Sequence, residues 1–158
     1  MARLPDRFDL WVRHARQCPD AARQADYVLS ALAALPEWVF LNLGSAQKPQ
    51  PAEAEIEGTR HLILFSGPDR LDDLTPSGRP LPKIAIPTTA AISWCLERRL
   101  DGIAGLLVNP GDDAFAVSLD QLEAFHTEWT QRGGRQSSGF WIPNLTTEEE
   151  DFWQEHGL

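Results

Sequence analysis

The sequence is poor in cysteine. Only Cys18 and Cys95 occur among 158 residues, and they do not form a CxxC motif. A short secreted domain that is held together by disulfide bonds normally contains more cysteines. Asp6, Asp9 and Arg13 also interrupt the apolar stretch that a secretory signal peptide would need. We therefore expect two free thiols in a reducing compartment, and a cytoplasmic protein.

Basic residues are scarce relative to acidic ones. Fourteen Lys and Arg stand against 23 Asp and Glu, which gives a formal net charge of -9. Nucleic-acid binding depends largely on cationic contacts to phosphates, and anionic membrane surfaces attract basic segments in the same way. This balance disfavours a nucleic-acid or membrane partner. It favours proteins, small molecules or basic peptides as partners.

The sequence also lacks an uninterrupted apolar run that would suit a membrane-spanning helix. The nearest candidate is the 18-residue window 27–44, whose only charged residue is Glu37. Pro36 and Glu37 lie in its middle, and proline breaks a helix while a carboxylate in the bilayer centre is costly. A helix that ends at Leu35 and is followed by a buried strand is the better interpretation.

Two amphipathic helices are predicted in the N-terminal leader, residues 6–35. Asp6 and Asp20 suit the N-cap positions, and Cys18-Pro19 separates the helices. Apolar residues recur at helical spacing in both: Phe8, Trp11, Val12 and Ala15, and then Tyr27, Val28, Ala31, Leu32 and Leu35. We expect the pair to form a helical hairpin.

Short apolar runs follow the leader and predict strands at Trp38–Leu43, Arg60–Phe65, Lys83–Ile86, Ile103–Val108 and Ala114–Val117. Residues 44–58 show no apolar period and are predicted to be a loop. Helices are predicted at three further places: one or two turns over residues 67–74, a helix from Thr88 or Thr89 to Gly102, and a helix from a capping box at Ser118 and Gln121 to Gly133.

This order predicts a single α/β domain over residues 1–158, of the mixed α+β kind. Its core, residues 36–130, would hold a mostly parallel or mixed sheet of four to five strands covered by helices. The strand at 83–86, the helix after it and the apolar strand at 103–108 form a candidate βαβ unit. Their continuous apolar runs indicate that both sheet faces are covered. Residues 137–158 form an aromatic and acidic tail.

The strings HLILFSGPDRLDDL, PKIAIPTTAAISWCLERRLDGIAGLLVNPG and FAVSLDQLEAF, in this order, resemble the N-terminal domain of the enhanced serine sensitivity protein family, SseB. The resemblance covers roughly residues 60–125, and its most specific piece is GLLVNPG at Gly105–Gly111. It implies a small mixed α/β bacterial domain without established enzymatic chemistry. The helical leader and the aromatic tail do not match the family.

The turn Asn109-Pro110-Gly111-Asp112 is the best candidate for a binding site. Ligands of parallel α/β sheets collect outside the carboxyl ends of strands, and the turn directly follows an apolar strand. Asn109 and Asp112 would supply the polar groups. The alternative, which we favour, is a tight connection that only reverses the chain.

The tail offers a candidate interaction surface in Trp141, Phe152 and Trp153. Aromatic side chains concentrate at the energetic centres of protein interfaces, so the tail could dock on a partner or on another subunit. The alternative is that the tail folds across its own domain and completes the core.

No metal or cofactor site is predicted. Glu123-x-x-His126 is the only carboxylate and histidine pair with helical ligand spacing, and it has no second copy. His61 and Cys95 are interpreted as a satisfied polar group and a small buried hydrophobe. No GxSxG motif and no phosphate-binding loop occurs.

The leading hypothesis is therefore a non-enzymatic protein-interaction module, which acts through a protein partner or self-association. An alternative is a small-molecule binder or uncharacterised enzyme that uses the turn 109–112 beside Thr88 and Thr89. A third is an immunity-type antitoxin, because an acidic domain can shield a basic toxin surface.

Overall fold

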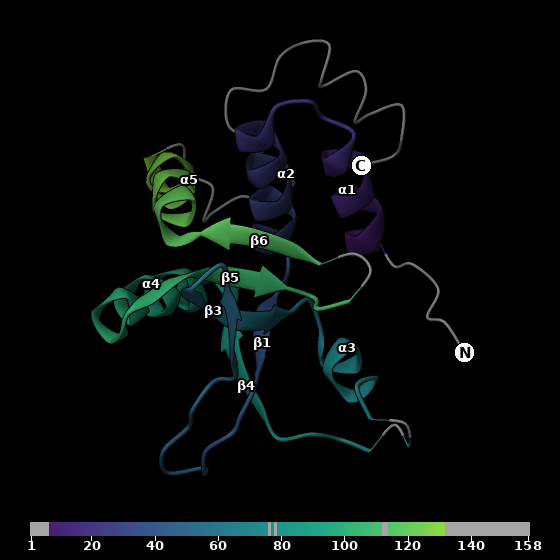
Figure 1. Cartoon of the computed structure of the whole chain (residues 1–158), viewed down its shortest axis with the longest axis vertical. Helices are drawn as coiled ribbons and strands as arrows, with labels where there is room; N and C mark the ends of the chain where they lie inside the picture. The colour runs from purple at the N-terminus through teal and green to yellow at the C-terminus, as the bar shows by residue number, and fades with distance from the viewer. Residues whose placement is uncertain (1–6, 76, 78, 112–113, 132–158) are drawn as a thin grey trace.

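The computed structural model describes residues 7–75, 77, 79–111 and 114–131. Its elements in chain order are α1 (Arg7–Arg16), α2 (Ala21–Ala33), β1 (Glu37–Leu41), β2 (Glu53–Ile56), β3 (Thr59–Phe65), α3 (Pro68–Asp72), β4 (Lys83–Pro87), α4 (Thr88–Glu97), the 3-10 helix η1 (Arg98–Asp101), β5 (Ile103–Val108), β6 (Phe115–Ser118) and α5 (Leu119–Gln131). The predicted α+β class is confirmed, with the helical pair α1 and α2 ahead of the sheet (Figure 1). None of the helices in the described ranges has the length and hydropathy of a membrane span.

All six strands belong to one mixed sheet with the order β4-β1-β3-β5-β6, in which β2 also pairs with β3. Among the described strands, only the neighbours β3 and β5 pair in parallel, and the other paired strands are antiparallel. The predicted runs at 60–65, 83–86 and 103–108 therefore do lie in one sheet. In the candidate βαβ unit, however, β1 and β3 separate β4 from β5, so α4 crosses over two strands.

The prediction of a loop over residues 44–58 is wrong at its end, where β2 pairs with β3. Glu57, at a φ of 51°, and Gly58, at a φ of 81°, make the tight turn between the two strands. The alternating Ala and Glu side chains of this segment follow the period of a strand, but the Glu residues are exposed, so no apolar pattern reveals it. The sheet consequently has six strands rather than four or five.

Local capping signals have mixed outcomes. The box at Ser118 and Gln121 is confirmed, since each residue's backbone N–H donates to the other's side chain at 3.0 Å. Asp20 caps α2 as predicted, whereas Asp6 lies outside the described residues. The threonine cap of α4 is wrong: Pro87 is the N-cap, and the Thr88 hydroxyl donates to the Leu35 carbonyl.

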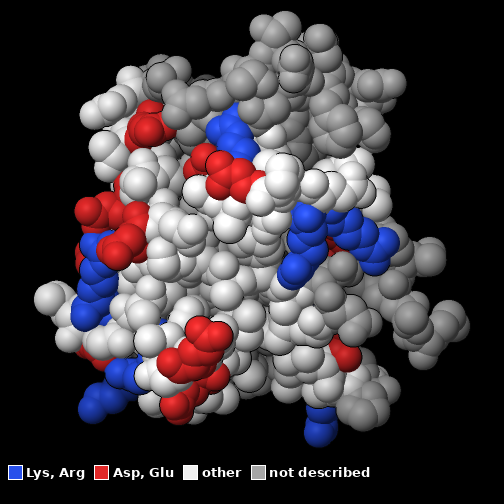
Figure 2. Space-filling view, turned by 45° about the horizontal axis from the view of Figure 1, so that its top comes forward, with Lys and Arg blue, Asp and Glu red and all other residues white. Residues whose placement is uncertain are grey.

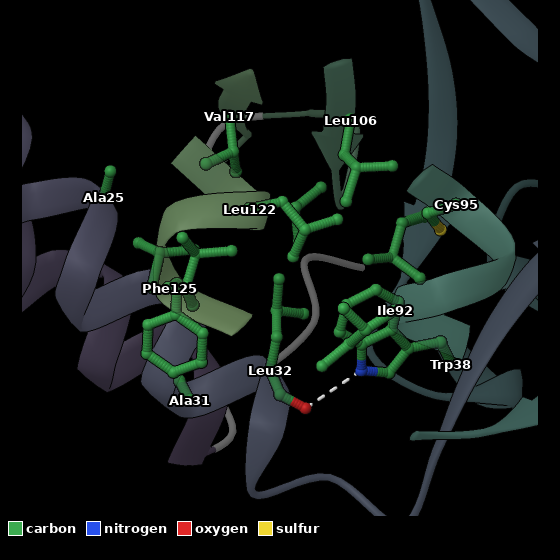
Figure 3. Close-up of a cluster of buried hydrophobic side chains, with 14 of the residues drawn as sticks. Ala25, Ala31, Leu32, Trp38, Ile92, Cys95, Leu106, Val117, Leu122 and Phe125 are labelled. Atoms are coloured by element: carbon green, nitrogen blue, oxygen red, sulfur yellow. Dashed lines mark hydrogen bonds between the residues drawn. The ribbon is translucent and has the colours of Figure 1, made fainter. Parts of the chain in front are cut away.

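The main core lies between one sheet face and the helices α1, α2, α4 and α5. Figure 3 shows its centre, formed by Leu32 on α2, Trp38 on β1, Ile92 and Cys95 on α4, Leu106 on β5, Val117 on β6, and Leu122 and Phe125 on α5. The Trp38 indole Nε1 donates to the Leu32 carbonyl at 2.9 Å. This bond ties the helical hairpin to the sheet.

The opposite sheet face is covered only in part within the described residues. Leu71 of the short helix α3 packs there against Val39 and Phe65, with Leu41, Ile63 and Leu81 around them. Because α3 has five residues, it covers β1 and the end of β3 but does not reach across β5 and β6. Within the described ranges, the expectation that both sheet faces are covered is met on one face and only in part on the other.

The helical layer contains a partly buried carboxyl group, Asp26 on α2. Burial raises its pKa above the ordinary 3.8, Arg23 opposes this increase from 3.5 Å, and the charges of Glu128 and Asp20 add to it. A carboxyl group whose pKa is raised by folding stabilises the fold most when protonated. Its contribution is complete below pH 3.8 and is lost as the pH rises through the folded pKa.

The Asp26→Asn variant is expected to lack this component of the pH dependence and to gain stability relative to the wild type at neutral pH. Urea unfolding curves, recorded at about every pH unit between pH 3 and pH 8, measure the difference in the free energy of unfolding between the variant and the wild type. Asp69→Asn, on the opposite side of the sheet, is the matched control. A constant difference between Asp26→Asn and wild type across the series would contradict the prediction.

Candidate functional site

The predicted binding turn lies where the parallel strands β3 and β5 end. Ser66 follows β3 and Asn109 follows β5, so both residues lie at the same edge of the sheet. The Asn109 backbone N–H donates to the Leu64 carbonyl at 2.8 Å. Its side-chain Oδ1 accepts from the Ser66 N–H at 3.0 Å, and its Nδ2 donates to the Ser66 Oγ at 3.0 Å.

These bonds occupy the Asn109 amide within its own sheet. The residue is 2% exposed and has a φ of 47°, a left-handed conformation that asparagine tolerates better than most residues. Pro110 and Gly111 continue the turn, and Asp112 lies outside the described residues. The geometry favours the tight-connection interpretation, and ligand binding at residues 109–112 stays a prediction.

Replacing Asn109 with alanine is expected to destabilise the fold by about 1–3 kcal/mol, because the part-buried Ser66 N–H loses its acceptor. Asn109→Asp keeps that acceptor and is expected to lose less. Guanidinium chloride unfolding of both variants measures which of them loses more stability. Equal stability of Asn109→Ala and wild type would show that the hydrogen bonds between Asn109 and Ser66 contribute nothing to stability.

Helices α1 and α3 meet beside this edge through buried and half-buried charges. The Arg70 Nη1 of α3 donates to both carboxylate oxygens of Asp9 on α1, at 2.7 and 2.6 Å. The Asp9 side chain is 3% exposed and the Arg70 side chain 14%. Arg16, at the end of α1, donates to the Ala114 carbonyl and lies over the Phe115 ring. Arg70 therefore connects α3 to α1, and Arg16 connects α1 to the segment before β6.

The remaining predicted chemistry is dispersed. Burial raises the pKa of the Cys95 thiol far above its ordinary value, which suits a core residue. Glu123 pairs with Arg99, which also binds Asp120, so Glu123 is held by a cation and not by His126. In the described part of the chain, no group of three or more potential metal ligands occurs.

A second surface, which the sequence did not reveal, lies on the partly covered sheet face. Strand register brings Ile63, Leu107 and Ala116 into one row across β3, β5 and β6. Ile63 and Leu107 are half-buried, and Ala116 is exposed. We call this surface the open face and define it by these residues and their neighbours on the same face, Ala54, Ile56, His61, Gly105 and Ser118.

The floor of the open face is closely packed. His61 lies opposite Gly105 in the register, and its Nδ1 is 3.2 Å from the Thr59 carbonyl oxygen. A Cβ atom on Gly105 would lie 2.4 Å from the Val117 carbonyl oxygen and 2.8 Å from the His61 Cδ2. Glycine is therefore required at this position because both the neighbouring backbone and the imidazole approach it.

Gly105→Ala is expected to lower the free energy of unfolding by about 1–3 kcal/mol, since overpacking forces the strands apart. Adding His61→Ala relieves only the ring contact and is expected to restore part of the loss. Gly67→Ala, whose Cβ would meet nothing within 4 Å, is the control. Thermal unfolding of the set tests the prediction, which a fully stable Gly105→Ala protein would contradict.

The open face carries no charged side chain, and charges elsewhere on the surface are grouped. Figure 2 shows acidic and basic side chains in several separate clusters, with broad uncharged areas between them. Exposed Glu57 lies in the β2–β3 turn at one end of the open face, whereas Glu55 alternates with Ala54 and Ile56 and therefore points to the opposite sheet face. Exposed Asp69 and Asp73 lie on or directly after α3 at another end of the open face.

The fold defines a class, namely a mixed α+β domain in which, among the described residues, four helices cover one sheet face and the short helix α3 covers part of the other. Comparisons with family models, curated proteins and solved structures returned no match. The SseB resemblance over residues 60–125 therefore stays a prediction. The predicted interaction residues Trp141, Phe152 and Trp153 lie outside the described residues.

Proposed function

We propose that this chain is a protein-interaction domain and that its docking surface is the open face. The observation that carries the proposal is the apolar row Ile63, Leu107 and Ala116, half-buried or exposed, which runs from β3 across β5 to the edge strand β6. Contiguous exposed apolar surface marks interaction sites, and the centre of an interface is depleted of charge. The open face combines both properties.

The open face is also a rigid, preorganised surface for binding a partner. Its residues lie on paired strands, which hold their side chains at fixed spacing, and Gly105 lies in close contact with His61 on the neighbouring strand. A partner therefore meets a preorganised surface, and little conformational entropy is lost when it binds.

The alternatives receive different support. A small-molecule site at residues 109–112 is less favoured, because the Asn109 amide is already bonded to Ser66. An immunity-type antitoxin is a special case of the proposed function, in which the partner is a basic toxin. The formal net charge of -9 favours such a partner.

Site-specific photo-crosslinking in the native host tests the proposed function. A photoreactive residue at position 107 is expected to give a discrete adduct with another protein, and Ala116→Arg is expected to suppress it. The same residue at Leu100, which is 92% exposed on η1, is the matched control. Equal adducts from both positions, or none from position 107, would contradict the proposal.

A further inference from the structure

Strand β4 lies at one end of the sheet, and in the described part of the chain no strand pairs with its outer edge. The other end, β6, is partly occupied. Arg16 of α1 donates to the Ala114 carbonyl directly before β6 and lies over the Phe115 ring. An outer strand with unpaired backbone groups is a template for pairing with another chain. Of the two ends, β4 is therefore the one that is open to such pairing.

The register of β4 on β1 shows which of its backbone groups point outward. Two backbone hydrogen bonds flank this ladder in the same register: Asn42 N–H to the Pro82 carbonyl at 2.9 Å, and Thr88 N–H to the Pro36 carbonyl at 3.2 Å. Because hydrogen-bonded and non-hydrogen-bonded pairs alternate along an antiparallel ladder, Ile84 and Ile86 are the residues that bond to β1. The backbone groups of Lys83, Ala85 and Pro87 consequently point away from β1.

We infer that two copies of this chain pair through β4, antiparallel and around a two-fold axis at Ala85. The outward row is complementary to itself in this register. Each Ala85 exchanges N–H and C=O bonds with the same residue of the second copy, and each Lys83 N–H donates to the Pro87 carbonyl opposite. Pro87 has no N–H, so the ladder ends there.

The side chains of β4 also suit a second copy. On the helical side of the sheet, Ile84 lies opposite Ile86 of the other copy, and both are half-buried residues that pack against the main core. Apolar cross-strand pairs of this kind stabilise a ladder. On the other side, Ala85 is exposed and small, so it leaves room at the axis. Lys83 is the only charged residue of β4, and its Nζ already bonds to Asp72 at 2.6 Å.

The symmetry of the pairing limits it to two copies. Both copies use the same edge, and once β4 is paired neither copy has another β4 edge to offer. The row Ile63, Leu107 and Ala116 lies on β3, β5 and β6, which β1 separates from β4. The dimer therefore leaves both open faces accessible, and the inference does not rest on the proposed function.

Sedimentation velocity of the full-length chain over a range of concentrations tests the inference. The wild type is expected to show monomer and dimer in reversible equilibrium. Ala85→Lys and Ala85→Glu each place two like charges opposite each other at the axis, and each is expected to weaken association by about tenfold or more. Because Ala85 is exposed, both variants are expected to fold, which thermal unfolding verifies.

An equimolar mixture of the two variants tests the axis itself. Opposite charges then face each other at position 85, and association is expected to recover to at least the wild-type level. Only a contact that brings position 85 of two copies together gives this recovery. Ala116→Lys and Ala116→Glu, at an exposed position of the edge strand β6, are the matched controls and are expected to leave the dimer unchanged.

Hydrogen exchange supplies a second readout that is specific to the strand. The amide of residue 85 points away from β1, so it is expected to be protected in the wild-type dimer and to exchange faster in each single variant. A wild type that stays monomeric at every concentration would overturn the inference. So would a dimer that is insensitive to charge at position 85, a mixture that shows no recovery, or rapid exchange of this amide in the dimer.

Discussion

Arg70→Met is expected to lower the free energy of unfolding by about 3–5 kcal/mol, the range found when one member of a buried ion pair is removed. In the wild type, Arg70 donates two hydrogen bonds to Asp9, whose side chain is 3% exposed. The variant keeps a similar apolar stem but takes the guanidinium away from a carboxylate that remains shielded from water. The loss should exceed that of any surface ion pair in the chain.

A double-mutant cycle distinguishes this cost from loss of packing. Asp9→Leu combined with Arg70→Met removes both charges and is expected to be more stable than either single variant. Arg99→Met, which breaks the exposed pairs with Asp120 and Glu123, is the control and is expected to cost about 0–1 kcal/mol. Urea unfolding measures all four. Additive single effects would show that Asp9 and Arg70 are not coupled.

This pair also shows where sequence interpretation stops. Asp9 has the position of an ordinary acidic residue in the first turn of a helix, and that local pattern is correct as far as it goes. Its partner, Arg70, is 61 residues away, on a helix that covers the opposite sheet face. Nothing in the spacing of residues near Asp9 indicates such a contact.

Elements with local signals were predictable, and the open face was not. The apolar runs at 60–65 and 103–108 predict β3 and β5, and the reciprocal bonds of Ser118 and Gln121 follow from their spacing. A continuous apolar run, however, is the same whether one or both faces of its strand are covered. How far α3 extends over the sheet decides the exposure of Leu107, and that is a tertiary property.

Strand β2 was missed for a related reason. Its Glu side chains point to solvent, and their partners on β3 are specified by register and not by composition. Because β2 supplies Ala54 and Ile56, the missed strand also hid one side of the open face. The candidate docking surface thus depends on contacts between segments, and the composition of each segment alone does not indicate these contacts.

Trp38→Ala is expected to destabilise the fold by about 3–5 kcal/mol, which is the usual cost of truncating a large aromatic side chain in a core. Trp38 is 1% exposed and lies where β1, α2 and α4 converge (Figure 3). Truncation leaves a cavity that the paired strand β1 cannot close, because its register with both β3 and β4 fixes the backbone.

The Trp38→Phe variant separates volume from hydrogen bonding. It keeps most of the apolar contact but loses the indole donor to the Leu32 carbonyl. That carbonyl still accepts from the Leu35 N–H at 3.1 Å, so it retains a partner and the cost of the lost bond is modest. We therefore expect Trp38→Phe to lose clearly less stability than Trp38→Ala in chemical unfolding. If the two variants lost equal stability, the indole bond and not the buried volume would be what joins the helical hairpin to the sheet.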